Sequence, residues 1–172
     1  MEKLSSRYSL GDMIVHRSYG IGQIDEIEFK ILNGTKVECF KVKTKNGDYW
    51  FPTDSPNNPR IHLVASQELI NEAIEILQST PHGLENDLLQ WKERIDEVQS
   101  DGDFLAISKL VRDLSALKAK KKLNRTQDQA LNNLEDRLIN EWAAGLGVDV
   151  ISIRPRLKAY LQEGKTQFQN AV

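Results

Sequence analysis

The sequence has little cysteine and no long apolar run. Among its 172 residues the only cysteine is Cys39, so the chain cannot form an internal disulfide, and we expect a reducing environment. Cys39 lies in a stretch of alternating apolar residues, which favours a small buried side chain over a reactive thiol. No segment approaches the roughly 18 consecutive apolar residues of a membrane-spanning helix, and no apolar run follows the first charged residues. We therefore expect a cytoplasmic protein that is neither exported nor inserted into a membrane.

The sequence also lacks an excess of positive charge. It contains 23 Lys and Arg residues against 25 Asp and Glu residues, which gives a formal net charge of −2. The chain as a whole is therefore not a general DNA-binding polycation. Any contact with nucleic acid must come from a local patch or be supplied by a larger complex.

The residue spacings of common catalytic and metal sites are missing as well. The histidines His16, His62 and His82 are far apart, with no Cys or carboxylate at metal-ligand spacing. His16 and His62 fall in expected strands that could bring them together, but an ordinary structural role is favoured. Gly20-Ile21-Gly22 is not followed by a helix, so it is no phosphate-binding loop, and no serine has the context of a nucleophile elbow. We expect no enzyme activity, no cofactor or metal, and no small-molecule substrate.

The first third of the chain predicts short β-strands joined by tight turns. Asn33-Gly34 is the strongest hairpin signal, because both central positions of a type I′ turn need positive φ, and Asn46-Gly47 is a second such turn. Pro52 ends the strand that follows by removing a donor, and Ile61–Val64 reads as a last short strand. Such a series of strands predicts a small SH3-like or Tudor-like barrel.

The segment from Gly20 onward shows a break in its apolar alternation. Ile27 and Phe29 share one parity, whereas Ile24 falls on the other. A β-bulge shifts the alternation by one residue and bends the strand, and Gly20 and Gly22 are candidate positions for it.

From Ser66 onward the apolar period becomes helical. One stripe consists of Leu88, Trp91, Ile95 and Val98, so the indole of Trp91 is predicted to face a helical core. Further signals are a cap at Asp103, a capping box at Thr126–Gln129, a stop at Gly145 or Gly147, and Pro155, which a helix tolerates only in its first turn. The predicted fold is therefore α+β, with a small SH3/Tudor-like β barrel at residues 1–65 followed by an all-helical bundle at residues 66–172.

One basic cluster stands out in the helical part. It consists of Lys118, Lys120, Lys121 and Lys122, with Arg112 and Arg125 nearby. Positive charge at the end of a helix also relieves exposed carbonyl groups, so a solvated helix terminus is slightly favoured over a phosphate-contacting patch.

The aromatic run Tyr49-Trp50-Phe51 is the second candidate surface. Alternation places Trp50 on the opposite face of its strand from Tyr49 and Phe51. An exposed aromatic on an edge strand is a plausible docking feature, since the edge also offers unpaired backbone groups. Packing of Trp50 under the following loop is an equal alternative.

Two groups of motifs, one in each predicted domain, point to a family. The first is Gly11–His16 with Tyr19–Gly22, and the second is Gly102-Asp103 followed by Leu110–Leu114. In this order they resemble the CarD/CdnL family of bacterial transcription regulators, over about residues 10–161. His16-Arg17 stands where the family usually has Tyr-Pro.

The resemblance implies a partner and a process. In that family the β domain binds the β subunit of RNA polymerase through a strand edge flanked by basic side chains. Lys30 falls on one such basic position, and Trp50 on another where arginine is common. The implied polymerase-binding residues are Lys30, Tyr49, Trp50 and Phe51.

The helical domain of the family touches promoter DNA, and here the sequence departs from the pattern. A tryptophan that wedges into the minor groove is replaced by Asp87, followed by Leu88 and Leu89. Within Leu123–Asp128 an acidic residue stands where the family has a basic residue that contacts DNA, whereas Lys92 matches a basic contact position. The candidate DNA-binding residues are Lys92, from the resemblance, and the basic cluster Arg112, Lys118, Lys120, Lys121, Lys122 and Arg125. We expect the protein alone to bind promoter DNA weakly.

Three hypotheses follow. The first is a transcription regulator that binds the polymerase β subunit and modulates promoter open-complex stability. The second is an interaction adaptor that keeps the family fold without the DNA wedge. The third, from another class, is a Tudor-type reader in which Tyr19, Tyr49 and Trp50 form an aromatic cage for a cationic ligand.

Overall fold

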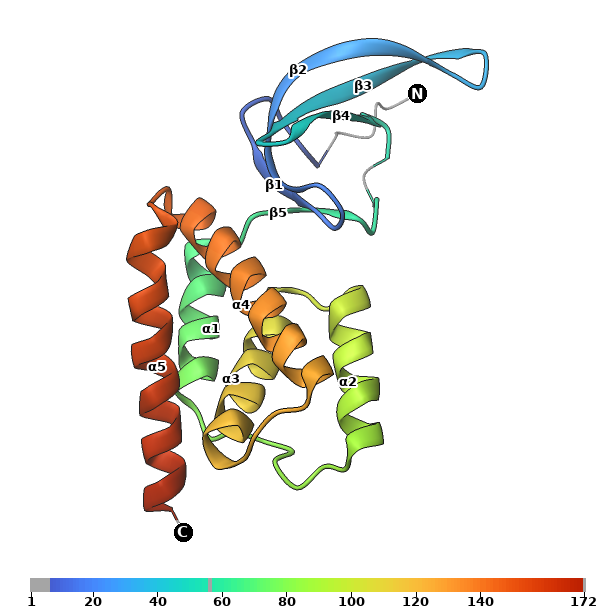
Figure 1. Cartoon of the computed structure of the whole chain (residues 1–172). Coiled ribbons are helices and arrows are strands. Elements are labelled where there is room, and N and C mark those ends of the chain that lie inside the picture. The colour runs from blue at the N-terminus through green and yellow to red at the C-terminus, as the bar shows by residue number, and fades with distance from the viewer. Residues whose placement is uncertain (1–6, 56, 172) are drawn as a thin grey trace. The chain divides into compact units, whose positions relative to one another are not determined.

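The computed structural model describes residues 7–55 and 57–171. The chain divides into two compact units, one up to Val64 and one from Ala65 (Figure 1). The first unit holds an antiparallel sheet and the second holds helices, so the predicted α+β class, with the β part first, is confirmed. Among the described residues, no helix has the length and apolar character needed to cross a membrane.

The β unit is one antiparallel sheet with the strand order β4-β3-β2-β1-β5. Its strands are β1 (Met13–His16), β2 (Gly20–Leu32), β3 (Thr35–Thr44), β4 (Gly47–Pro52) and β5 (Ile61–Leu63). The sheet curls around a small apolar core (Figure 1). The buried core residues are Tyr8, Ile14, Ile24, Phe40, Val42, Tyr49, Phe51 and Ile61.

The two predicted hairpins differ in outcome. Asn33 and Gly34 have φ values of 51° and 80°, so both central positions of the β2–β3 turn are left-handed, as predicted. The β3–β4 turn was predicted one residue too late: Thr44 pairs with Gly47, so the two loop residues are Lys45 and Asn46. The hydroxyl of Thr44 accepts from the Asn46 amide and donates to the Gly47 carbonyl, which holds the turn in this register.

The bulge in β2 lies between Ile24 and Glu26, so the prediction of a bulge at Gly20 or Gly22 is wrong. The bulge puts both Ile24 and Ile27 on the core face, opposite Val42 and Phe40 of β3. Gly22 has a different role. A Cβ there would lie 2.6 Å from the Val42 side chain and 2.8 Å from the Lys43 carbonyl oxygen, so glycine permits the close approach of β2 to β3.

The helical unit is built around α3, which contacts all four other helices (Figure 1). The helices are α1 (Gln67–Gln78), α2 (Leu88–Asp101), α3 (Phe104–Lys120), α4 (Arg125–Leu146) and α5 (Val150–Asn170). Two helices, α4 and α5, approach the backbone of a neighbouring segment closely. A Cβ at Gly145 would lie 2.4 Å from the carbonyl oxygen of Ala65, and a Cβ at Gly164 would lie 2.8 Å from that of Leu77.

Some helix ends follow the sequence prediction and others do not. Asp103 caps α3, and Gly147 ends α4 with a left-handed φ of 65°, as predicted. The capping box of α4 is formed by Asn124 and Gln127, two residues before the predicted one. Because α5 already begins at Val150, Pro155 lies beyond its first turn, contrary to the prediction.

The stripe predicted for α2 is correct in its centre and wrong at its start. Trp91 and Ile95 are each 1% exposed, so the indole of Trp91 is buried in the helical core, as predicted. Leu88, which was assigned to the same stripe, is 67% exposed. It is the first residue of the helix, and its side chain lies outside the packed face.

Candidate functional site

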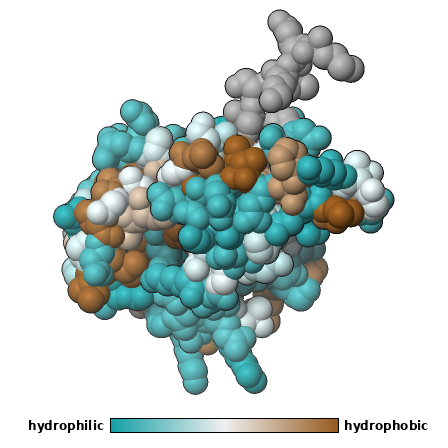
Figure 2. Space-filling view, turned by 90° about the horizontal axis from the view of Figure 1, so that it is seen from above, coloured by the Kyte–Doolittle hydropathy of each residue, from teal (hydrophilic) through white to brown (hydrophobic). Residues whose placement is uncertain are grey.

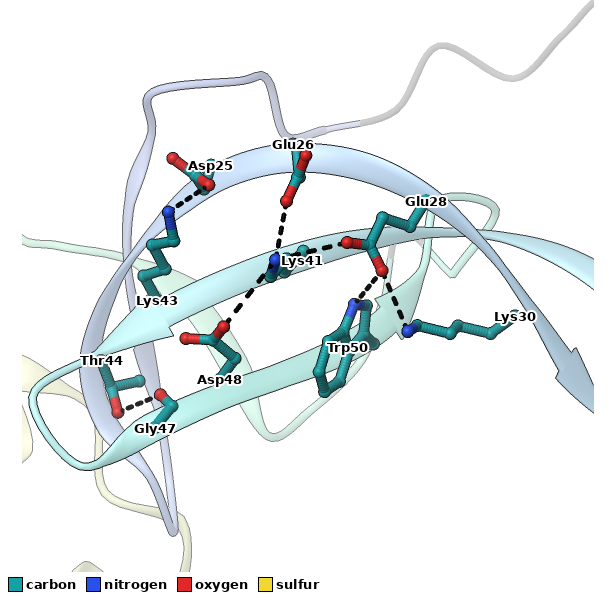
Figure 3. A network of polar contacts seen from close by, with 10 residues as sticks. All are labelled: Asp25, Glu26, Glu28, Lys30, Lys41, Lys43, Thr44, Gly47, Asp48 and Trp50. Atoms are coloured by element: carbon teal, nitrogen blue, oxygen red, sulfur yellow. Dashed lines mark hydrogen bonds and ion pairs between the residues drawn. The ribbon is translucent and has the colours of Figure 1, made fainter.

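Polar contacts cover the outer face of the sheet around Trp50, as one connected group centred on Lys41 and Glu28 and a separate ion pair between Lys43 and Asp25 (Figure 3). We call this set of residues the Trp50 network; it consists of Asp25, Glu26, Glu28, Lys30, Lys41, Lys43, Asp48 and Trp50. The indole Nε1 of Trp50 donates to a carboxylate oxygen of Glu28 at 3.0 Å. Lys30 Nζ lies 2.9 Å from the same oxygen and 4.1 Å from the Trp50 ring centroid. The indole is thus held from its edge by Glu28 and over its face by Lys30.

Lys41 of β3 links β2 and β4 on this face. Its Nζ lies 2.7 Å from a Glu26 oxygen, 3.3 Å from a Glu28 oxygen and 3.9 Å from an Asp48 oxygen. Hydrogen bonds from Lys30, and then from Lys41 and Trp50, outweigh desolvation and lower the pKa of Glu28 to about 2. Hydrogen bonds with Glu26 and Glu28 raise the pKa of Lys41. These groups therefore stay ionised over the physiological pH range.

Among the residues that the structure describes, β4 pairs with β3 alone, so Trp50 lies on an edge strand of the sheet. In an antiparallel pair, backbone groups point alternately toward the partner and away from it. Thr53 donates from its amide to the Glu38 carbonyl just past β4, which places the inward-bonded positions at the odd-numbered residues. The backbone groups of Asp48 and Trp50 consequently face away from β3, which is the orientation that pairing with a further strand requires.

Side-chain exposure sorts the predicted polymerase-binding residues. Trp50 is 40% exposed, so packing under the following loop is wrong for this side chain. Tyr49 and Phe51 are only 8% and 4% exposed and belong to the core of the sheet, so their side chains are not available to a partner. Their backbone groups face β3, so neither residue offers a direct contact at the β4 edge. Lys30 lies beside Trp50 on the outer face.

The arrangement of aromatic rings contradicts the cage hypothesis. Tyr49 and Trp50 lie on opposite faces of β4, so they cannot line one cage. Tyr19 instead stacks on Tyr49 with ring centroids 5.0 Å apart, and His16 lies 4.5 Å from Tyr19 and 5.0 Å from Tyr49. These rings fill the space between one another, which leaves no room for a cation among them.

His16 is held in the neutral form within this ring cluster. Its Nδ1 accepts hydrogen bonds from the backbone amides of Ser18 and Tyr19, at 3.0 and 3.2 Å. Burial, and then the charge of Arg60, lower the pKa of His16. His16 is paired with Ile61 and His62 with Val15, so the two histidines point to opposite faces of the sheet. In the part of the chain that the structure describes, no group of three metal-ligating side chains occurs.

An apolar stripe that the sequence analysis did not single out lies on the β2–β3 hairpin. Ile27, Phe29, Ile31 and Leu32 are 43%, 60%, 78% and 44% exposed. Ile27, Phe29 and Ile31 continue the core face of β2, whereas Leu32 lies on the other face. From Phe29 onward β3 is paired with β2 alone, because its pairing with β4 reaches only to Cys39. Figure 2 shows hydrophobic residues in separate small groups among hydrophilic ones on the face it displays.

The structure brings most of the predicted basic cluster together. Lys118, Lys120, Lys121, Lys122 and Arg125 are exposed where α3 ends and α4 begins. Lys118 forms an ion pair of 2.9 Å with Asp128, so part of the positive charge is already compensated.

Arg112 does not belong to this surface and is removed from the DNA-binding residues. It is 6% exposed, and its guanidinium donates to Asp113 at 2.7 Å and to the Ser79 hydroxyl at 2.7 Å. Arg94 from α2 forms an ion pair with the same carboxylate, which also accepts from the His82 amide at 2.9 Å. Asp113, which is fully buried, thus ties the α1–α2 loop and α2 to α3. The motif Leu110–Leu114 marks this internal anchor.

The first turn of α2 presents two apolar side chains to solvent. Asp87 is the N-cap, with its carboxylate accepting from the Gln90 amide in a capping box. Leu88 and Leu89 are 67% and 63% exposed. Lys92 lies one turn further along and is also exposed, in an ion pair of 3.2 Å with Asp96. Because the sequence analysis placed Leu88 in the core, it missed this exposed pair.

Comparison with known proteins gives matches for both units. The model of the CarD-like/TRCF RID domain matches residues 8–62, and the model of the CarD C-terminal domain matches residues 72–158. YdeB of Bacillus subtilis (strain 168), described as a candidate transcription factor, is 29% identical over 147 residues. This alignment covers 82% of the chain and 94% of YdeB.

Proposed function

The chain belongs to the CarD family, and from this membership we propose that it is a cytoplasmic bacterial transcription regulator that binds the β subunit of RNA polymerase. The β unit supplies the polymerase contact. The helical unit then acts on upstream promoter DNA and shifts the stability of the open complex. A change of about 1.4 kcal/mol in that equilibrium alters open-complex occupancy tenfold before saturation, so modest contacts suffice.

The observation that carries the proposal is the position of β4 at an edge of the described sheet, with Trp50 held on its outer face. Strand addition uses main-chain hydrogen bonds for affinity and adjacent side chains for specificity. The outward-facing backbone groups of Asp48 and Trp50 provide the first, and the partly exposed indole provides the second. Trp is among the residues that dominate interface energetics, since it buries a large area with few rotatable bonds.

A binding experiment with the full chain tests the polymerase contact. Trp50→Glu places a second carboxylate beside Glu28 and removes the indole, so we expect binding to RNA polymerase to weaken at least about tenfold. The variant keeps its melting temperature, because the side chain lies outside the core. Lys36→Glu, a larger charge change on the opposite face of β3, serves as the control and retains binding. Unchanged binding of Trp50→Glu would reject this interface.

For the DNA contact, we propose Leu88 and Leu89 as the apolar group that meets the promoter. The family resemblance places the minor-groove wedge at Asp87, whose carboxylate is already engaged in the N-cap. The two exposed leucines follow it directly, and Leu is among the side chains that proteins insert between base steps. Lys92 and the exposed basic residues where α3 ends and α4 begins would contact phosphates.

The adaptor function remains the second candidate, favoured by the acids Asp87 and Asp128 at positions where the family contacts DNA. The lifetime of promoter open complexes separates the two functions. A regulator loses its effect on that lifetime in Leu88→Ala/Leu89→Ala while still binding polymerase. An adaptor binds polymerase equally well with and without the two leucines and leaves the lifetime unchanged in both forms.

A further inference from the structure

The positive charges of the Trp50 network are paired with carboxylates of the same network. It contains three ammonium groups, those of Lys30, Lys41 and Lys43, and each lies within ion-pair distance of a carboxylate. Four carboxylates face them, from Asp25, Glu26, Glu28 and Asp48. The outer face beside the β4 edge is therefore close to neutral, with a slight excess of negative charge. This face therefore offers a partner the ring of Trp50, while every ammonium group of the network is already paired with a carboxylate.

Glu28 holds the centre of this arrangement. It is the one carboxylate of the network that contacts the indole, Lys30 and Lys41 together. Since the Trp50 side chain is partly exposed and extends from an edge strand, few core contacts restrict its rotamer. The hydrogen bond from Nε1 to Glu28 and the Lys30 ammonium over the ring supply that restriction. Ordering an interface side chain before binding lowers the entropy that association must overcome.

We propose that Glu28 is the positioning residue for Trp50, and that this face recognises a neutral, apolar strand edge on its partner and not an acidic one. The inference rests on the proposed polymerase contact and specifies its chemistry. Complementary charges steer association and make it dependent on ionic strength, whereas a neutral aromatic face does neither to a large extent. Binding through this face should therefore have a shallow salt dependence.

A matched pair of variants tests the proposal. Glu28→Ala and Glu26→Ala each remove one carboxylate and one partner of Lys41, but only Glu28 contacts Trp50. The binding of the full chain to RNA polymerase is measured for both variants at about 0.05 M and about 0.5 M salt, ionic strengths that differ strongly in screening. We expect Glu28→Ala to weaken binding about fivefold at both salt concentrations, as the loss of one well-placed hydrogen bond predicts. Glu26→Ala should change binding less than twofold.

If the partner surface is acidic, the two substitutions have the opposite effect on binding. Both substitutions then release Lys41 and add one positive charge, so both strengthen binding to a similar extent, and the gain disappears at high salt. That outcome overturns the inference, as does equal weakening by the two variants.

A second measurement follows Trp50 without any polymerase. The other tryptophans, Trp91 and Trp142, are each 1% exposed, so quenching of the native protein's fluorescence by acrylamide reports mainly on Trp50. Glu28→Ala should increase this quenching and Glu26→Ala should not. Equal quenching in both variants overturns the positioning role. Failure of the unaltered chain to bind polymerase at either salt concentration would instead refute the proposed function.

Discussion

At the scale of single residues, His16 shows how a small sheet accommodates a titratable ring. Its Nδ1 has to keep a lone pair to accept from the amides of Ser18 and Tyr19, and its ring packs against Tyr19 and Tyr49. Protonation would remove the acceptor and place a charge near Arg60. The folded state therefore favours the neutral ring, in agreement with the lowered pKa.

This preference predicts a pH-dependent stability of the β unit. Above the ordinary histidine pKa of 6.5, His16 is neutral in both the folded and the unfolded chain, and the stabilising acceptor is fully present. As the pH falls below 6.5 the unfolded chain binds a proton first, so the free energy of unfolding decreases until the folded pKa is passed. Thermal melting between about pH 7.5 and pH 5 should show this decrease. His16→Asn, whose side-chain oxygen accepts without titrating, should show a smaller one; an equal decrease would contradict the assignment.

Three residues of the helical unit show why the burial of some side chains could be predicted from sequence and that of others could not. Trp91 lies in the middle of an apolar stripe, and helical periodicity alone predicts its burial correctly. Leu88 fits the same stripe, but it opens the helix, and periodicity carries no information on where the packed surface ends. Arg112 had no signal of burial at all, since a buried guanidinium depends on a carboxylate and a hydroxyl that the fold brings to it.

At the scale of elements, the anchor of the α1–α2 loop is Asp113. Its carboxylate accepts from the His82 amide and pairs with both Arg94 and Arg112. Because the carboxylate is fully buried and compensated, its removal would leave the guanidinium of Arg112 buried without its charged partner. This contact fixes the loop that leads to Leu88 and Leu89.

We expect Asp113→Ala to lower the free energy of unfolding by about 3–5 kcal/mol, as when one partner of a buried ion pair is removed. Urea unfolding followed by circular dichroism measures the loss. The control is Asp96→Ala, which breaks an exposed ion pair with Lys92 and should cost less than about 1 kcal/mol. Similar losses in the two variants would show that Asp113 is no anchor.

Element boundaries were the weaker part of the sequence prediction. The order of strands and helices follows from the change of period near residue 65, because each period reports a whole element. The bulge between Ile24 and Glu26 and the α4 cap at Asn124 did not follow. Several polar residues near a helix start can serve as the cap, and tertiary packing selects among them. The edge position of Trp50 was predictable from Pro52, whereas the pairing of Glu28 with the indole required the register of β2, β3 and β4.

At the scale of the whole molecule, charge limits what the protein does alone. With a net charge of −2 and one lysine of the basic cluster paired with Asp128, the chain has little net attraction for DNA phosphates. Affinity for duplex DNA should be weak and should come mainly from the exposed lysines at the end of α3. In the proposed function, promoter contact depends on the polymerase bringing the helical unit to the DNA.

We expect binding of the isolated protein to duplex DNA to fall steeply with salt, because phosphate neutralisation releases counterions. Lys121→Glu/Lys122→Glu should reduce the slope of log K against log salt by about 1–2, as expected for the loss of one or two phosphate contacts. Lys109→Glu, an exposed lysine of α3 outside the cluster, is the control and should leave the slope nearly unchanged. Nanomolar affinity at physiological salt that both variants retain would contradict this expectation.

The close contacts at Gly145 and Gly164 have a consequence for the sequence variation that these positions tolerate. Every missense mutation that a single base change can produce in a glycine codon introduces at least a Cβ atom. At these two positions that atom would lie 2.4 Å and 2.8 Å from a backbone carbonyl oxygen, which no flexible side chain can relieve. Every amino acid change that a single base substitution can produce at these two codons should therefore strain the helical unit, even though neither residue belongs to a surface that we propose as a partner contact.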